Sequence, residues 1–181
     1  MSILGKLLGV VSPGPGPAPS SSSAGDTETV RKIVAKLESL PPDRARYLGA
    51  FAYIMGRVAN ADLDISEQET LKMEEIVRRL GHLPEEQALL VVQIAKSQNR
   101  LFGGTESYVV TREFKEISSP EQRTDLLDCL FAVSAADDSI SATEENLVHQ
   151  IASELGFTHR EYVAIRSDYS DKRAVLQGGK G

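Results

Sequence analysis

A 24-residue segment occurs twice in this chain at a separation of 75 positions, and this repeat limits the possible folds more than any other feature of the sequence. Residues 58–81 align with residues 133–156, and nine of the 24 aligned positions are identical. The identical pairs are Val58/Val133, Ala61/Ala136, Asp62/Asp137, Ile65/Ile140, Ser66/Ser141, Glu69/Glu144, Ile76/Ile151, Leu80/Leu155 and Gly81/Gly156. Each copy has a short polar loop followed by apolar residues at helical spacing, which predicts a helix–loop–helix unit. Since a single unit leaves one apolar face uncovered, we expect the two copies to pack together.

Apolar residues keep helical spacing throughout residues 26–181, and no alternating run of β-branched and aromatic residues favours a strand. Residues that end helices lie between the periodic stretches, such as Pro41, Pro42 and Gly81. The sequence therefore predicts an all-α helical bundle. The expected helices lie at about 26–40, 43–59, 66–80, from 84 onward, 105–117, 120–135, 141–155 and from 158 onward. The residues expected in the core are Phe51, Met55, Ile76, Leu80, Leu126, Leu127, Leu130, Val133, Ile151 and Leu155.

The N-terminal part of the chain differs from the rest and divides into two segments. Residues 12–25 are all Ser, Pro, Gly or Ala, which predicts a disordered linker that buries no apolar surface. Residues 1–11 form a short amphipathic peptide, too short to cross a membrane. Its candidate docking side chains are Ile3, Leu4, Leu7 and Leu8. This peptide either packs back onto the domain at 26–181 or recruits the chain to a partner protein, a shell or a membrane surface.

Composition excludes several functional classes. The net charge of −6 and the pI near 5.2 argue against binding to nucleic-acid phosphates. Cys129 is the single cysteine, so an intrachain disulfide and a cysteine-rich zinc site are excluded. Cys129 aligns with an apolar position and His149 with an outward position, so we expect a buried, inert thiol and a solvent-exposed imidazole. Because no nucleophile is paired with a base, we expect a protein-binding module that is not an enzyme. A signal peptide is not recognisable either, so we expect a cytoplasmic location.

The repeated loop, at 61–69 and 136–144, has the shared pattern A-D-x-x-I-S-x-x-E and admits two interpretations. In the first, the Ser is a helix N-cap and the Glu three residues later completes a capping box. In the second, carboxylates of the two loops converge on a hard divalent cation, Ca²⁺, Mg²⁺ or Mn²⁺. The candidate ligands are Asp62, Glu69, Asp137 and Glu144. The loop is not an EF-hand, because Val58 and Val133 occupy the position of the first ligand.

The two loops resemble the repeated A-D-G-x-I-x-x-x-E signature of TerB-like domains, the all-helical family named for bacterial tellurite resistance. The resemblance covers roughly residues 45–170 and is closer in the second copy. It implies a bundle of about seven helices with pseudo-twofold symmetry, and an acidic patch on the four carboxylates just named. The glycine of the family signature is replaced by Leu63 in the first copy and by Asp138 in the second, a departure that bears on cation binding.

Together, the resemblance and the residues predict a non-enzymatic interaction or scaffold module of a bacterial stress system of the tellurite-resistance type. Divalent-cation binding by the paired acidic loops is a further hypothesis within this prediction. The alternative is a cargo or adaptor protein that its N-terminal amphipathic peptide recruits to a shell or membrane surface.

Overall fold

The computed structural model describes residues 21–59, 65–101, 107–137 and 139–172, and this part of the chain contains eight α-helices and no β-strand. The helices are α2 (Ser21–Glu38), α3 (Pro42–Ala59), α4 (Glu67–Arg79), α5 (Glu85–Leu101), α6 (Ser107–Ile117), α7 (Pro120–Ser134), α8 (Ala142–Leu155) and α9 (His159–Ser167). Two short 3₁₀ helices follow α7 and α9, namely η2 (Ala135–Asp137) and η3 (Ser170–Lys172). The predicted all-α fold is confirmed, and the region that the family resemblance covers holds the seven helices α3 to α9, in agreement with the number that the resemblance implied.

Helix α3 lies at the centre of the bundle because it is apolar on nearly every side. All residues from Tyr47 to Gly56 are buried, as expected for a helix that is surrounded by other helices. Helices α5, α6 and α7 pack along it, and α2 and α8 make smaller contacts. The Phe114 ring of α6 lies 5.3 Å from the Tyr47 ring and 6.1 Å from the Phe51 ring, centroid to centroid. These tilted and edge-on aromatic contacts fix α6 against α3.

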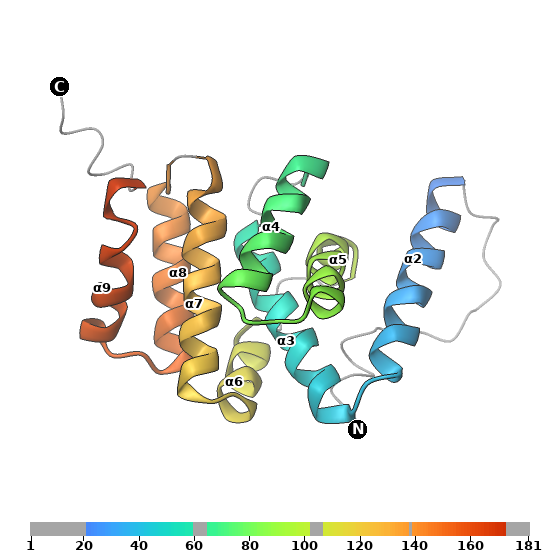
Figure 1. Ribbon diagram of the computed structural model, residues 1–181, viewed down its shortest axis with the longest axis horizontal. Helices are drawn as coiled ribbons and strands as arrows, with labels where there is room; N and C mark the ends of the chain where they lie inside the picture. Colours follow the sequence, from blue (N-terminus) through green and yellow to red (C-terminus); the bar gives the residue numbers. More distant parts are fainter. Residues whose placement is uncertain (1–20, 60–64, 102–106, 138, 173–181) are drawn as a thin grey trace.

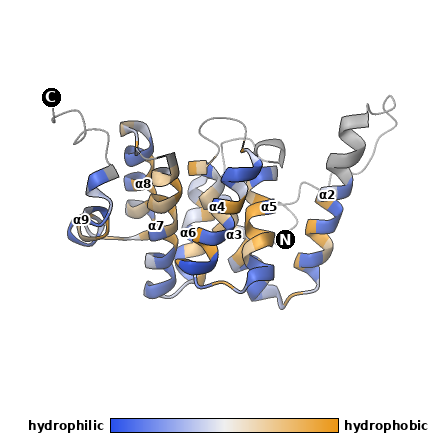
Figure 2. Cartoon of the chain, turned by 45° about the horizontal axis from the view of Figure 1, so that its top comes forward, coloured by the Kyte–Doolittle hydropathy of each residue, from blue (hydrophilic) through white to orange (hydrophobic). Residues whose placement is uncertain are grey.

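The remaining helices extend from this centre in two directions (Figure 1). Helices α7, α8 and α9 pack against one another at one end of the molecule. Helix α2 lies at the opposite end, where it contacts α5 and α3. Apolar residues are concentrated on the inner helices, most visibly on α5 and α7, as Figure 2 shows.

Seven of the ten predicted core residues are buried, and the other three lie at the edge of the core. The three exceptions are Ile76, Leu80 and Val133, which are partly buried and pack against the core. Ile76 and Leu80 border an open depression between α4 and η2, which leaves the outer part of both side chains accessible. Helical spacing identified the inward face of α4 correctly, but not how far the neighbouring helices cover it.

The predicted boundary between linker and domain needs a correction. Helix α2 begins at Ser21, so the last five residues of the predicted linker, 21–25, belong to a helix. The serines and Ala24 in this stretch are compatible with a helix once the following residues form one, because a helix grows more easily than it nucleates. The rest of the predicted linker and the whole of the N-terminal peptide 1–11 lie outside the described residues.

The two repeat copies end their second helix in different ways. Gly156 adopts the left-handed conformation with φ of 90° and ends α8 as a glycine C-cap does. At the end of α4 it is His82, not Gly81, that has positive φ, at 51°. Gly81 is required for another reason, since a Cβ atom there would lie 2.5 Å from the Val77 carbonyl oxygen. Glycine is therefore needed at the aligned positions 81 and 156 for different reasons, close packing at Gly81 and positive φ at Gly156. The predicted pseudo-twofold symmetry of the bundle stays a prediction.

Candidate functional site at the paired acidic loops

Glu69 of the first acidic loop is part of a capping box at the start of α4. Its carboxylate accepts a hydrogen bond of 2.6 Å from the Ser66 backbone N–H, and its own N–H donates to the Ser66 hydroxyl over 3.2 Å. Hydrogen bonding to the Ser66 hydroxyl and backbone N–H lowers the pKa of Glu69. This carboxylate is therefore held ionised by the helix end that it caps.

The second loop forms the same box at the start of α8. Glu144 accepts hydrogen bonds from the Ser141 backbone N–H at 2.8 Å and from the Ser141 hydroxyl at 2.6 Å. The Glu144 N–H donates in return to the Ser141 hydroxyl over 3.2 Å. The capping interpretation of the repeated Ser and Glu is confirmed in both copies.

Two lysines bring positive charge to these loops. Lys72 of α4 donates a hydrogen bond of 3.2 Å to the carbonyl oxygen of Ala136, in the second loop. Lys96 of α5 donates over 2.8 Å to the Thr70 hydroxyl, in the first turn of α4. These ammonium groups offset part of the negative charge of the loops.

The four predicted cation ligands are described to different extents. Glu69 and Glu144 complete the two capping boxes. Asp62 lies outside the described residues, and for Asp137 the structure describes the backbone, in η2, but not the side chain. Within the part of the chain that the structure describes, no group of three or more His, Cys, Asp or Glu side chains is arranged to hold a metal ion. Cation binding at these loops stays a prediction. The docking residues Ile3, Leu4, Leu7 and Leu8 also lie outside the described part.

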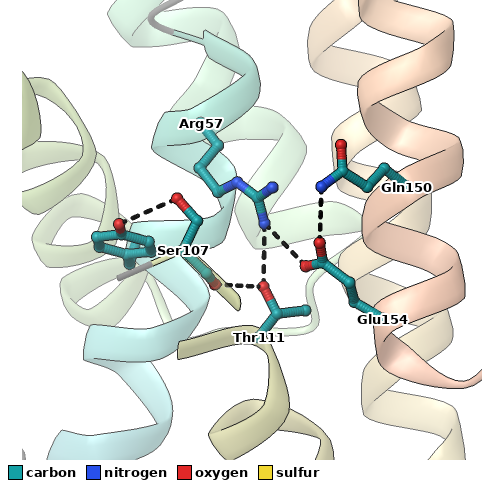
Figure 3. A network of polar contacts seen from close by, with 6 residues as sticks. Arg57, Ser107, Thr111, Gln150 and Glu154 are labelled. Atoms are coloured by element: carbon teal, nitrogen blue, oxygen red, sulfur yellow. Dashed lines mark hydrogen bonds and ion pairs between the residues drawn. The ribbon is translucent and has the colours of Figure 1, made fainter. Parts of the chain in front are cut away.

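A partly buried polar network that the sequence analysis did not identify joins α3, α6 and α8 (Figure 3). Arg57 donates to Glu154 at 3.1 Å and to the Thr111 hydroxyl at 3.0 Å, and the Arg57 and Glu154 side chains are each only 11% exposed. Gln150 donates to the other Glu154 oxygen at 2.9 Å, and Thr111 donates to the Ser107 carbonyl at 2.9 Å. These contacts join the three helices and fix their relative positions.

Residues that sequence reasoning considered for catalysis are placed where catalysis is not expected. Cys129 is buried, and burial raises the pKa of its thiol, which disfavours the reactive thiolate. His149 is exposed as predicted, and its ring lies against those of His159 and Tyr162 rather than beside a carboxylate. Both predictions for these residues are confirmed.

An open groove runs between α4 and α5, on a side of α4 that other described helices leave uncovered. Leu71, Ala88 and Leu89 form its apolar lining, and Leu71 is 66% exposed. The charged residues along it are Glu74, Glu75, Glu85 and Arg78. The groove is a candidate binding surface because an exposed leucine and charged side chains line the same concave site.

Residues 48–167 match the family model described as Tellurite resistance protein TerB, which covers 120 of the 181 residues. The chain belongs to the TerB family. The match includes both acidic loops and both repeat copies of this TerB chain, from the middle of α3 to the end of α9. No curated protein and no solved structure matches it. Among the described residues of the TerB chain, no helix is long and apolar enough to span a membrane.

Proposed function

We propose that this TerB-family chain is a non-enzymatic protein-interaction module of a tellurite-resistance-type stress system, and that its binding surface is the groove between α4 and α5. The observation that carries the proposal is the exposure of Leu71 in that groove. Burying a leucine side chain of this kind on binding contributes about 1.5–3 kcal/mol before ordering costs are subtracted. The family membership supports a module of this type, and the engaged polar groups of the bundle favour binding over catalysis.

The charges of the groove favour one class of ligand. Three carboxylates, of Glu74, Glu75 and Glu85, face one guanidinium, of Arg78. Glu75 also pairs with Arg79 of the same helix at 3.3 Å. An apolar lining bordered by excess negative charge suits an amphipathic helix that carries leucine-like side chains and a basic residue.

The N-terminal peptide of this same chain has that composition. Leu4 and Leu8 are four residues apart, as side chains on one helical face are, and Lys6 supplies a positive charge. Helix α2, which follows the peptide in the chain, packs against α5, one wall of the groove. Residues 1–11 are therefore a suitable probe for the groove, whether the natural ligand is this segment or one like it on a partner protein.

The test uses the full chain with Leu4→Asp and Leu8→Asp, so that its own peptide cannot compete, and a fluorescent peptide of residues 1–11. We expect the peptide's anisotropy to rise with protein concentration, and Leu71→Asp to weaken binding at least about tenfold, which corresponds to 1.4 kcal/mol. Val109→Asp on α6, where the side chain is 58% exposed, is the matched control and should change nothing. Equal loss in both variants, or an absence of binding, would contradict the proposed groove.

The alternative function is recruitment of the chain by residues 1–11 to a membrane or shell surface. The apolar face formed by Ile3, Leu4, Leu7 and Leu8 favours it. Flotation with lipid vesicles separates the two functions. If the wild-type chain floats and the Leu4→Asp, Leu8→Asp variant does not, while the free peptide fails to bind the groove, the recruitment function replaces the groove proposal.

A further inference from the structure

His149 of α8 and His159 of α9 lie side by side on the surface at the end of the bundle formed by α7, α8 and α9. Their ring centroids are 6.2 Å apart and their ring planes are inclined by 75°. Both side chains are exposed. We propose that this histidine pair is a binding site for a divalent transition-metal ion of the kind that prefers imidazole, such as Zn²⁺ or Ni²⁺.

The two helices that carry the pair are fixed to each other. Tyr162 of α9 is 2% exposed, and its hydroxyl donates to the Glu145 carbonyl oxygen of α8 over 3.4 Å. Arg166 of α9 adds an ion pair to the Glu145 carboxylate at 3.1 Å. The His149 ring rests on the Tyr162 ring at 4.6 Å between centroids, so one member of the pair has an aromatic support. A pair held in this way needs little reordering to chelate an ion.

The backbone position of His159 is also fixed, because α9 begins at this residue. Thr158 caps the helix, and its backbone N–H and hydroxyl each donate to the Glu161 carboxylate over 2.7 Å. Within the described part of the chain, His149 and His159 make ring contacts, and neither makes a hydrogen bond or an ion pair. By contrast, His82 lies 3.1 Å from the carboxylate of Asp125. The imidazole nitrogens of the pair are therefore accessible to a ligand.

The distance between the rings is close to what a shared ion requires. Zinc binds imidazole nitrogen at about 2.0–2.1 Å in tetrahedral geometry, which places the centres of two rings roughly 5 Å apart. Rotation of the two exposed side chains has to bring the rings together by roughly 1 Å, well within ordinary rotamer changes. Water fills the other coordination positions. The nitrogen donors separate this site from the acidic loops, whose oxygen donors suit Ca²⁺, Mg²⁺ or Mn²⁺.

Isothermal titration of ZnCl₂ into the full chain without a polyhistidine tag tests the proposal. We expect one ion per chain. His149→Gln and His159→Gln should each weaken zinc binding at least about tenfold. Once one imidazole has bound the ion, the other lies close to it at a high effective concentration, and either substitution removes this chelate effect. His82→Gln is the matched control and should leave the affinity unchanged, as should Asp62→Asn with Asp137→Asn. Unchanged zinc affinity in either pair variant, or equal loss in the His82 control, would overturn the proposal.

A second measurement reports on the position of the ion. Since the ion joins α8 to α9, zinc should slow amide hydrogen exchange in α9 of the wild-type chain but not of His159→Gln. Calcium at the same concentration should leave exchange in α9 unchanged. A stoichiometry of one ion per two chains, with a dimer in light scattering, would show that the ion bridges molecules, and would overturn the pair as an intramolecular site.

Discussion

Arg57 and Glu154 form an ion pair of 3.1 Å that joins the helix leading into the first repeat copy to the second helix of the second copy. The repeat does not duplicate this pair. At an offset of 75 positions, Arg57 corresponds to Ala132 and Glu154 corresponds to Arg79, which is exposed. This contact therefore joins α3 to α8 without a counterpart in the repeat.

Breaking this ion pair from one side should destabilise the bundle strongly. Glu154→Leu leaves the Arg57 guanidinium buried with only the Thr111 hydroxyl as a partner, and removal of one member of a buried pair costs about 3–5 kcal/mol. The double variant Arg57→Met, Glu154→Leu leaves no charge behind and should recover most of that loss. Urea denaturation gives the free energy of unfolding of the single and the double variant. A double variant no more stable than the single one would contradict this account of the network.

The aligned residues Leu80 and Leu155 should differ in their contribution to stability. Leu155 is fully buried, so Leu155→Ala should lower the free energy of unfolding by about 2–5 kcal/mol. Leu80 is only partly buried beside the depression between α4 and η2, so Leu80→Ala should cost clearly less. Chemical denaturation of the two variants under one condition gives the comparison. Equal losses would contradict the unequal burial of these two side chains.

The capping box of α4 should give the protein a component of acid sensitivity. The pKa of Glu69 is lowered in the folded chain, chiefly by hydrogen bonding to Ser66. A lowered pKa means that this interaction stabilises the fold above the ordinary glutamate pKa of about 4.3, and that the stabilisation is lost as the pH falls through and below that value. Glu69→Gln keeps the capping box but does not titrate, so its stability should fall less between about pH 5 and pH 3 than that of the wild type. Denaturation curves of both proteins across this pH range, with EDTA present, measure the difference in stability. If the stabilities of wild type and Glu69→Gln fall in parallel, the predicted acid sensitivity is contradicted.

The cation hypothesis and the capping boxes make different predictions about metal dependence. If Asp62, Glu69, Asp137 and Glu144 bind a divalent cation, then millimolar Ca²⁺, Mg²⁺ or Mn²⁺ should raise the melting temperature above that in EDTA. At a hundredfold excess over Kd, the free energy of unfolding should rise by about 2.7 kcal/mol. Asp62→Asn with Asp137→Asn should abolish the rise without affecting the caps. If none of the cations changes the melting temperature of the wild type, the cation hypothesis is contradicted and the loops are helix caps alone.

The fold was predictable from sequence because the signals that define it are local. Helical spacing, Pro41 with Pro42, and the Ser and Glu of the repeated loops located the helices and two of the capping boxes. Two further boxes, Ser119 with Gln122 and Thr158 with Glu161, carry the same signature three residues apart and were missed. A search for that spacing alone would have found them.

The surface features were less predictable because they depend on contacts between distant segments. The pairing of Arg57 with Glu154 spans 97 positions, and its only trace in the sequence is a charge that directly follows the buried stretch from Tyr47 to Gly56. The closeness of His149 and His159 depends on how α9 packs on α8. Likewise, the exposure of Leu71 depends on which helices fail to cover α4.

The proposed function depends on the binding of a basic amphipathic segment in the groove between α4 and α5. Amide hydrogen exchange of the full chain with Leu4→Asp and Leu8→Asp, with and without the free peptide of residues 1–11, tests it most directly. We predict that the peptide slows exchange in α4 and α5 and leaves α9 unchanged, and that Leu71→Asp removes this protection. Unchanged exchange in α4 and α5, or protection confined to α6 around the exposed Tyr108 and Val109, would contradict the claim.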